Sequence, residues 1–425
     1  MTNFAEHPWR NPGKWVVQHL NYANYQDSPP REVFVVDSTI RSICTSEPGS
    51  LITPGQLIEI IAKLEDVGVK SVMLNIAHMR GHSELAHETA KLAVKQNFAK
   101  IKLDTGAAGI RPYKTDSEWM DEFHKMADIG VDELSISYGA GSTEDDDFYG
   151  TPSVFPVLHQ IAEYMHEQGF PPSISYNIKP HTSFPFFMEF VRQAARAKPR
   201  YFRVYDTYSS MSPHTIERIT RHIRAEFSRE VLPLVLHTHN GLGMAVASTC
   251  AAAYAGMDGI DVAVQGVGTK SGHTDLAETV VALETLYGIR TGIKLDELTA
   301  LCRLVEDRLG IRVHDRKPID GRHAFLKEQS WSVVSVLEER ISGEEHAIPI
   351  APSLVGGQRS IVWGKNTMKP YVIELKLKEM GLPSNQENIR TALDALQTEL
   401  ATRDKYPAWI EDEEATRIIE KTIVS

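Results

Sequence analysis

Short apolar segments alternate with longer segments of helical period between Phe34 and Tyr287, and this alternation constrains the fold more than any other feature. The short segments have the length of buried strands, and the segments between them carry apolar residues at the spacing of amphipathic helices. Such alternation is typical of parallel β-α-β units. The expected strands are residues 34–37, 69–74, 101–103, 133–137, 173–176, 201–205, 233–238 and 259–264.

The expected helix between the first two strands has the clearest ends. Thr53 is its N-cap, and Gln56 three residues later completes a capping box. Pro54 takes the first helical position, where a missing N–H costs nothing, and Gly68 ends the helix just before the next strand. Gly256 precedes a later strand in the same way, which indicates a repeated helix-to-strand connection.

Eight β-α units in about 250 residues match a TIM (β/α)8 barrel. An open, doubly wound sheet is the alternative, but evenly spaced units without a sign of a strand-order switch favour closure. Beyond Gly292 the pattern changes, and helices are expected at residues 296–310, 329–340, 368–381, 385–403 and 411–423, with a Gly-, Pro- and Ser-rich loop at 342–357. The predicted domains are an N-terminal extension (1–32), a TIM-barrel catalytic domain (33–292) and a mostly helical C-terminal appendage (293–425).

Composition excludes several classes of partner. The formal net charge of -11 argues against nucleic acid and anionic membrane surfaces, because both require a basic face. The three cysteines are far apart in sequence, so neither a disulfide framework nor a paired-cysteine metal site is indicated. No apolar run approaches the length of a bilayer span, and the N-terminus has no signal-type apolar core. We therefore expect a soluble, cytoplasmic protein.

Three places at the ends of expected strands predict a metal site. Asp37 ends the first strand, His237 and His239 end the seventh, and His273 lies in the loop after the eighth. Residues i and i+2 of a strand point to the same face, and barrel closure brings the first, seventh and eighth strands together. One carboxylate with two or three imidazoles suits Zn, Mn, Co or Fe(II) better than Mg or Ca. Arg41 adds positive charge at the same barrel mouth.

Each of these residues also has an ordinary structural interpretation. An isolated histidine pair at a strand end is more often hydrogen-bonded than metal-bound, and Asp37 alone would suit a turn or a helix cap. Arg41 alone would suit a surface ion pair, and His273 could be a ligand, a neighbour of one, or part of a cap. The loop 266–268 only loosely matches a dinucleotide fingerprint, because Ser271 stands where the third glycine belongs. The combination nevertheless favours a metal site.

Several stretches resemble the DRE-TIM metallolyases. Residues 37–41 (DSTIR) resemble the D-x-T-x-R motif of that superfamily, and residues 237–247 are similar to its H-x-H-N-D-x-G-x-A-x-A segment. Residues 265–278 resemble the G-x-G-E-R-x-G-N-x-x-x-E loop of the isopropylmalate, homocitrate and citramalate synthases. Residues 317–325 resemble the K-P-x-x-G-x-x-A-F segment of these synthases, and 352–356 their P-x-x-V-G. The resemblance thus covers the barrel and reaches into the appendage, which points to the synthase branch.

The resemblance implies a TIM barrel that binds a divalent metal ion (Zn, Mn, Co, Fe or Mg). It implies an acyltransferase that joins an acyl-CoA to a 2-oxo acid by a Claisen-type condensation, with substrates that differ from those of the known synthases. It also implies a homodimer, because the synthases' appendage reaches over the neighbouring barrel. His273 aligns with the asparagine ligand of these enzymes, which makes the predicted ligands Asp37, His237, His239 and His273. The expected substrate-binding residues are Thr39, Thr207, Asn240 and Lys270.

The departures from the pattern fall on residues that carry acid–base chemistry. Ser42 replaces the aspartate after the arginine, Asn177 replaces a catalytic glutamate after the fifth strand, and Met73 replaces a glutamate of the second strand. Residues 327–332 replace the H-x-S-G-x-H segment whose last histidine helps to activate the acetyl group. General acid–base groups contribute large rate factors, so their exchange implies a rebuilt catalytic apparatus.

We therefore expect Arg41, Asn177 and His181 to be the catalytic residues. Further substitutes for the missing groups are His78, Lys179 and His323, although each of them alone would more often be an ordinary surface or core residue.

Three functions follow from these observations. The first is the metal-dependent condensation, supported by the metal frame and the synthase-like appendage. The second is metal-dependent cleavage or decarboxylation of a 2-oxo or hydroxy acid, supported by the missing acetyl-activating groups. The third is a non-catalytic barrel that binds a small acid, and the retained Asp37, Arg41, His237 and His239 weigh against it. Metal content and thiol release from an acyl-CoA separate these functions.

Overall fold

The computed structural model describes residues 9–22, 30, 32–46, 51–74, 84–110, 116–139, 154–180, 182–344, 347, 349–404 and 408–423. They form two compact units. The barrel unit is Leu20–Arg312, and the terminal unit combines the described residues of Met1–His19 with those of Val313–Ser425. Helix α10 (Leu298–Leu309), which we expected to begin the C-terminal appendage, groups with the barrel unit.

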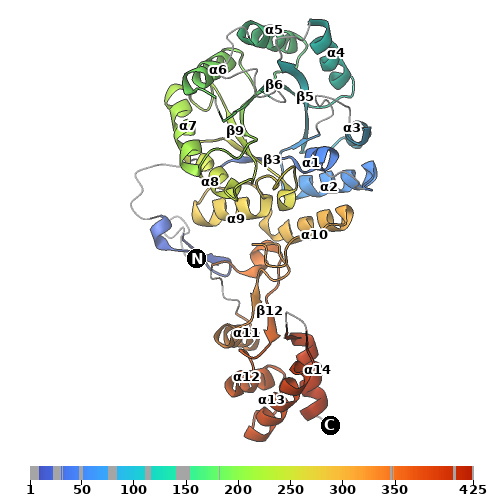
Figure 1. Ribbon diagram of the computed structural model, residues 1–425, viewed down its shortest axis with the longest axis vertical. Coiled ribbons are helices and arrows are strands. Elements are labelled where there is room, and N and C mark those ends of the chain that lie inside the picture. Colours follow the sequence, from blue (N-terminus) through green and yellow to red (C-terminus); the bar gives the residue numbers. More distant parts are fainter. Residues whose placement is uncertain are drawn as a thin grey trace. The chain divides into compact units, whose positions relative to one another are not determined.

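The barrel unit contains a closed barrel of eight parallel strands (Figure 1), which confirms the predicted TIM barrel and excludes the open sheet. Strand β10 closes it by pairing with β9 on one side and with β3 on the other. The strands are β3 (Phe34–Asp37), β4 (Ser71–Met73), β5 (Lys102–Ile110), β6 (Glu133–Tyr138), β7 (Ser173–Asn177), β8 (Phe202–Asp206), β9 (Leu234–Thr238) and β10 (Gly259–Val262).

All eight expected strands are present, and only β5 is clearly longer than predicted. Its extension includes Gly106-Ala107-Ala108-Gly109, whose small side chains carry no strand signal in the sequence. The register with β6 shifts between Gly106 and Ala108, which is the mark of a bulge.

Helices surround the barrel (Figure 1), and their ends follow the sequence signals. Gln56 N donates to Thr53 Oγ1 over 3.3 Å and Thr53 N donates to Gln56 Oε1 over 2.9 Å, which confirms the capping box. Gly68 ends that helix with a left-handed φ of 110°. The helices of this unit before α10 are α1 (Thr39–Ser46), α2 (Pro54–Val67), α3 (Glu84–Gln96), α4 (Asp116–Ala127), α5 (Val154–Glu167), α6 (Phe184–Arg196), α7 (Pro213–Glu226), α8 (Ala245–Ala255) and α9 (Leu276–Leu286).

The terminal unit is mostly helical, as predicted, but it also contains a small sheet of order β11-β12-β13 and a two-stranded sheet of β1 (Arg10–Asn11) and β2 (Trp15–Val16). These strands are too short to give a periodic signal. Trp363 of β12 is buried in the core of the unit, and its Nε1 donates to Asp412 Oδ1 over 2.8 Å. The elements are α11 (Ser330–Ser342), α12 (Pro370–Glu379), α13 (Gln386–Leu400) and α14 (Asp412–Ile423), with β11 (Leu326–Lys327), β12 (Ser360–Trp363) and β13 (Ile410–Glu411).

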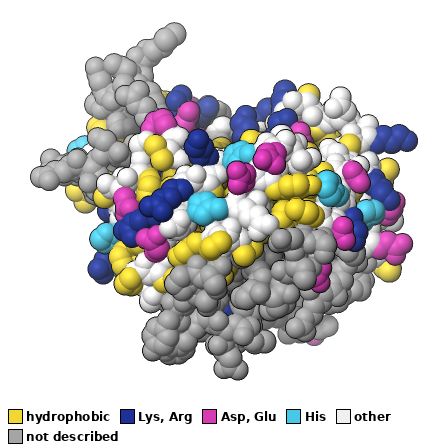
Figure 2. Space-filling model, turned by 90° about the horizontal axis from the view of Figure 1, so that it is seen from above, with side chains coloured by type: hydrophobic (Ala, Val, Ile, Leu, Met, Phe, Trp, Pro, Cys, Tyr) yellow, Lys and Arg dark blue, Asp and Glu magenta, His cyan; other side chains and the backbone are white. Residues whose placement is uncertain are grey.

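Charged side chains of both signs lie on the surface of the described residues. On the face drawn in Figure 2, basic and acidic side chains are interspersed with histidines and apolar groups over the described residues. No helix in the described part of the chain has the length and apolar character of a membrane span.

Replacing Gly68 by alanine is expected to lower the free energy of unfolding by about 3 kcal/mol, because a left-handed alanine is strained and its Cβ would lie 2.5 Å from Gly292 O. Gly169→Ala is the matched variant, because Gly169 also has a positive φ, +82°, but a Cβ there would have no neighbour within 4 Å. It should lose only about 1 kcal/mol. Urea unfolding of both variants measures the difference, and equal losses would contradict the close approach at Gly68.

Candidate metal centre

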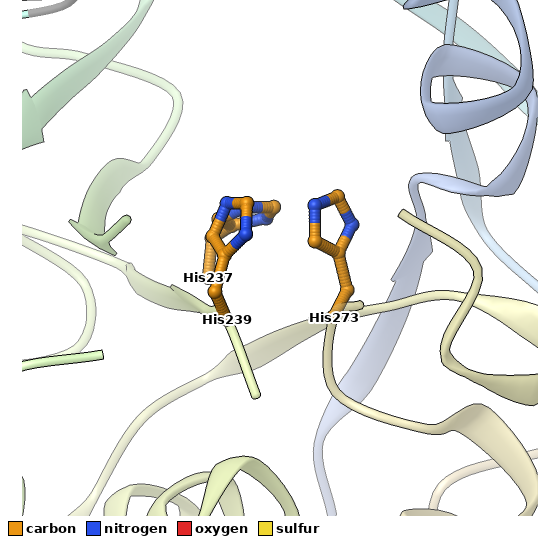
Figure 3. A group of neighbouring side chains, drawn as sticks. All are labelled: His237, His239 and His273. Carbon is orange, nitrogen blue, oxygen red and sulfur yellow. The ribbon is translucent and has the colours of Figure 1, made fainter. Parts of the chain in front are cut away.

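Three histidine rings meet at the carboxyl ends of β9 and β10. His237 belongs to β9, His239 follows it, and His273 comes from the loop after β10. His239 and His273 form an isolated antiparallel bridge, and Asn240 N donates to Gly272 O over 2.9 Å beside it. Figure 3 shows the three rings pointing toward one another. The backbone pairing therefore determines how close the rings lie.

The glycine-rich loop after β10 is shaped around His273. Gly272 has a φ of +88°, and a Cβ there would lie 2.2 Å from Gly266 O. A Cβ on Gly268 would lie 2.7 Å from the His273 ring. The glycines thus permit a tight turn that packs on the imidazole, which explains them without a dinucleotide.

The three rings have the properties of a metal-binding set. One ligand atom from each lies within 4.8 Å of the others. His237 is fully buried, and His239 and His273 are each only 3% exposed. Both ring nitrogens of His237 and His239, and Nε2 of His273, lack a hydrogen-bond partner. Buried polar atoms without partners are costly, and a bound cation would satisfy them. The donor set therefore fits a divalent metal ion.

Electrostatics keep the imidazoles neutral, which is the form that binds a metal. Burial lowers the pKa of His239 to about 4, with Arg41 as a further cause. Burial also lowers the pKa of His237 and His273 well below the usual range, and the Arg41 guanidinium contributes in both cases. The electron pairs of these rings are therefore available at neutral pH.

Two polar side chains lie next to the Nδ1 atoms of His237 and His273. Asp261 Oδ2 lies 3.1 Å from His237 Nδ1, although the two atoms are not aligned as a hydrogen bond. Ser42 Oγ lies 3.1 Å from His273 Nδ1 and is hydrogen-bonded to it. Asp261 is not among the residues predicted for the site, although a carboxylate within an otherwise apolar strand is a usable signal.

The predicted ligand Asp37 is not part of the three-histidine group. Its Oδ1 accepts from Thr39 N and its Oδ2 from Thr39 Oγ1, each over 2.8 Å. Burial raises the pKa of Asp37 to about 7. Thr39 Oγ1 also accepts from Val264 N over 2.8 Å. In the structure, these two residues tie the end of β3 to the loop after β10.

Arg41 lies beside the histidines. Its guanidinium carbon is 5.6 Å from the centre of the Tyr205 ring, and the Tyr205 and His237 ring centres are 4.4 Å apart. Arg41 Nη1 is 4.0 Å from Met73 Sδ. Met73 Sδ also lies 3.2 Å from Nη1 of the buried Arg203. A neutral sulfur therefore lies between two arginines.

Other predicted substrate-binding residues connect loops of the barrel mouth. Lys270 Nζ donates to Thr207 O over 3.0 Å and lies 4.9 Å from the centre of the Tyr208 ring. Asn240 Oδ1 accepts from Ala245 N over 3.2 Å and so caps the start of α8.

Some of the other residues predicted to take part in catalysis belong to the described part of the chain, and others do not. Asn177 ends β7, and its Oδ1 is buried without a hydrogen-bond partner. His181 and His78 lie outside the described residues. Lys179 is buried, and His323 belongs to the terminal unit, where it packs against Trp409.

The barrel and its histidine cluster define a TIM-barrel enzyme with a candidate metal centre at the catalytic face. The HMGL-like family model matches residues 33–305, so the chain belongs to the HMGL-like family. Its relatives are named as synthases, and the chain is therefore an enzyme.

Three relatives show the range of similarity. A putative (R)-citramalate synthase of Methanopyrus kandleri is 29% identical over 89% of this chain and 71% of its own length. A homocitrate synthase of the same organism is 29% identical over 87% of this chain and 88% of its own length. A 2-isopropylmalate synthase of Methanocaldococcus jannaschii is 26% identical over 93% of this chain and 72% of its own length.

Solved structures support the fold. A hydroxymethylglutaryl-CoA lyase of Pseudomonas aeruginosa matches with a TM-score of 0.55 at 16% identity, over 67% of this chain and 95% of the lyase. An HMG-CoA lyase of Acenitobacter baumannii, in complex with coenzyme A and 3-methylmalate, matches with a TM-score of 0.54 at 18% identity, over 66% and 92%. At this identity the likeness concerns the barrel alone.

Replacing Gly268 by alanine should weaken Zn²⁺ binding about tenfold or more, because the new Cβ would displace the His273 ring. Gly364→Ala is the matched control, since its Cβ would have no neighbour nearer than 3.8 Å. Competition with a chromogenic chelator measures the dissociation constant of each variant. Unchanged binding by Gly268→Ala would contradict a metal site that uses His273.

Proposed function

We propose that this enzyme uses a divalent metal ion, held by His237, His239 and His273, to condense an acyl-CoA with a 2-oxo acid. The buried cluster of three imidazoles with unpartnered ring nitrogens carries the proposal. The related proteins named as citramalate, isopropylmalate and homocitrate synthases support the reaction class. The changed residues Met73 and Asn177 support an atypical substrate pair.

The nature of the donors narrows the choice of ion. Three neutral imidazoles form a nitrogen set that suits Zn, Co or Fe(II), whereas Mg prefers oxygen ligands and bound water. Asp37 is the remaining predicted ligand, and it is engaged with Thr39 in the structure. We therefore place the ion on the histidines and expect Zn, Co or Fe(II) rather than Mg.

A bound ion would act as a Lewis acid that polarises the carbonyl of the 2-oxo acid. The chain supplies the surroundings of that carbonyl. The Arg41 guanidinium, whose charge reaches all three imidazoles, would bind an oxygen that becomes negative during the reaction. Tyr205 packs on His237 and keeps water from one side of the cluster. Exclusion of water strengthens each of these electrostatic contacts.

The condensation also needs a proton acceptor for the acyl α-carbon. The Asn177 amide cannot accept that proton at neutral pH, although it can hydrogen-bond a substrate through its unpartnered Oδ1. We assign proton transfer to His181, the histidine that follows β7 by four residues. Substrate positioning falls to Thr207, Asn240 and Lys270, and a homodimer remains our prediction.

Cleavage or decarboxylation of a 2-oxo or hydroxy acid is the second candidate. Met73 and Asn177 favour it, because neither position offers a carboxylate for activating an acyl-CoA. Solved structures with the same barrel fold are named as HMG-CoA lyases, which is consistent with this second candidate.

Metal analysis and a thiol assay together test the proposed function. The purified chain should carry about one Zn, Co or Fe ion, as one three-imidazole site predicts. His237→Ala and His239→Ala should lose the ion, and His214→Ala, whose side chain is 92% exposed, should retain it. Acetyl-CoA with a panel of 2-oxo acids should release free thiol only when both substrates are present.

The same assay distinguishes the alternatives. A carbonyl product from the acid alone, without thiol release, would support cleavage in place of condensation. A metal-free chain whose histidine variants behave like the wild type would exclude both reactions.

Arg41→Met should lower kcat by about 100-fold or more, because it removes positive charge next to the reacting carbonyl. Arg41→Lys retains the charge but not the planar group over Tyr205 and should keep part of the activity. The number of bound metal ions should stay at the wild-type value in both variants. Steady-state kinetics with metal analysis checks this, and wild-type kcat in Arg41→Met would contradict the assigned role.

A further inference from the structure

Two buried side chains, Ser42 and Asp261, each lie next to Nδ1 of one histidine of the cluster. We propose that Ser42 and Asp261 are positioning residues that make His273 and His237 present Nε2 to the metal. Ser42 Oγ and Asp261 Oδ2 each lie 3.1 Å from Nδ1 of their histidine. This inference rests on the proposed metal-dependent function and assigns the residues that organise its site.

The chemistry of imidazole explains why such contacts matter. A neutral ring carries one proton, and the nitrogen without the proton provides the electron pair for a metal. A proton held on Nδ1 by an acceptor leaves Nε2 available. His273 Nε2 and His237 Nε2 are both buried and have no hydrogen-bond partner. For His273, the nitrogen that this contact leaves available, Nε2, is the one that lacks a hydrogen-bond partner. For His237, neither ring nitrogen has a hydrogen-bond partner, and Asp261 Oδ2 is the carboxylate oxygen beside Nδ1.

The register of the barrel places Asp261 beside His237. Strand β10 pairs with β9 so that Asp261 lies opposite His237. Ser38 Oγ donates to Asp261 Oδ1 over 2.5 Å, and Arg203 Nε lies 3.8 Å from Asp261 Oδ2. A fully enclosed carboxylate needs such partners, and here they also restrict its movement. Asp261 is thus held by two neighbours next to the ring that it orients.

Ser42 and His273 form a second pair that depends on the chain's own substitutions. Ser42 lies in α1, directly after β3, and is only 1% exposed. It stands where the resembling synthases carry an aspartate, and His273 stands where they carry an asparagine. A hydroxyl accepts the Nδ1 proton without adding charge next to the ion. The two substitutions therefore belong to one altered donor set.

Cobalt binding tests the assignment with readouts that do not depend on catalysis. Ser42→Ala and Asp261→Asn should each raise the Co²⁺ dissociation constant about 10–100-fold and change the visible absorption spectrum of the bound ion. Ser42→Thr retains the hydroxyl and should restore near wild-type binding and spectrum. Ser248→Ala, a buried serine of α8, should leave both unchanged.

Unfolding by urea is measured for every variant, because Asp261→Asn also removes a charge partner of Arg203. Ser42→Ala lacks that complication and tests the proposal on its own. A wild-type chain that binds no Co²⁺ or Zn²⁺ would overturn the proposed function and this assignment with it. Wild-type binding combined with unchanged affinity and spectrum in Ser42→Ala and Asp261→Asn would overturn the assignment alone.

Discussion

The pairing of β10 with both β9 and β3 is the constraint on which the rest of the structure depends. It closes the barrel and brings residues far apart in sequence to one mouth. His237, Asp261 and Ser38 meet there because three adjacent strand ends meet there. Without closure, the three histidines would be ordinary strand-end and loop residues. Function in this chain is thus a consequence of strand register as much as of residue type.

Burial gives the site its chemical character. The imidazoles are neutral because a low-dielectric environment and the nearby Arg41 both disfavour a second proton. Neutral rings with unpartnered nitrogens are prepared for a metal but poorly suited to acid–base catalysis.

Family resemblance and geometry contribute different parts of this description. The chain belongs to the HMGL-like family, its relatives are named as synthases, and solved lyases share its barrel fold. The geometry adds two features of this enzyme. His273 lies in the same cluster as His237 and His239, and Ser42 is hydrogen-bonded to Nδ1 of His273. Met73, between Arg41 and Arg203, places a neutral sulfur between two positive charges of the mouth.

The sequence by itself determined the eight strands, the capped helices and the histidine pair, because these follow from local period, capping residues and side-chain alternation. Only the tertiary structure decided which side chains meet. Asp37 carries the family motif, yet its carboxylate oxygens accept from Thr39, while Asp261, without a motif, lies next to His237. The small sheet of the terminal unit likewise escaped prediction, since strands of two to four residues have no period. Local patterns determine elements, whereas cross-strand register and ring orientation arise only when the barrel closes.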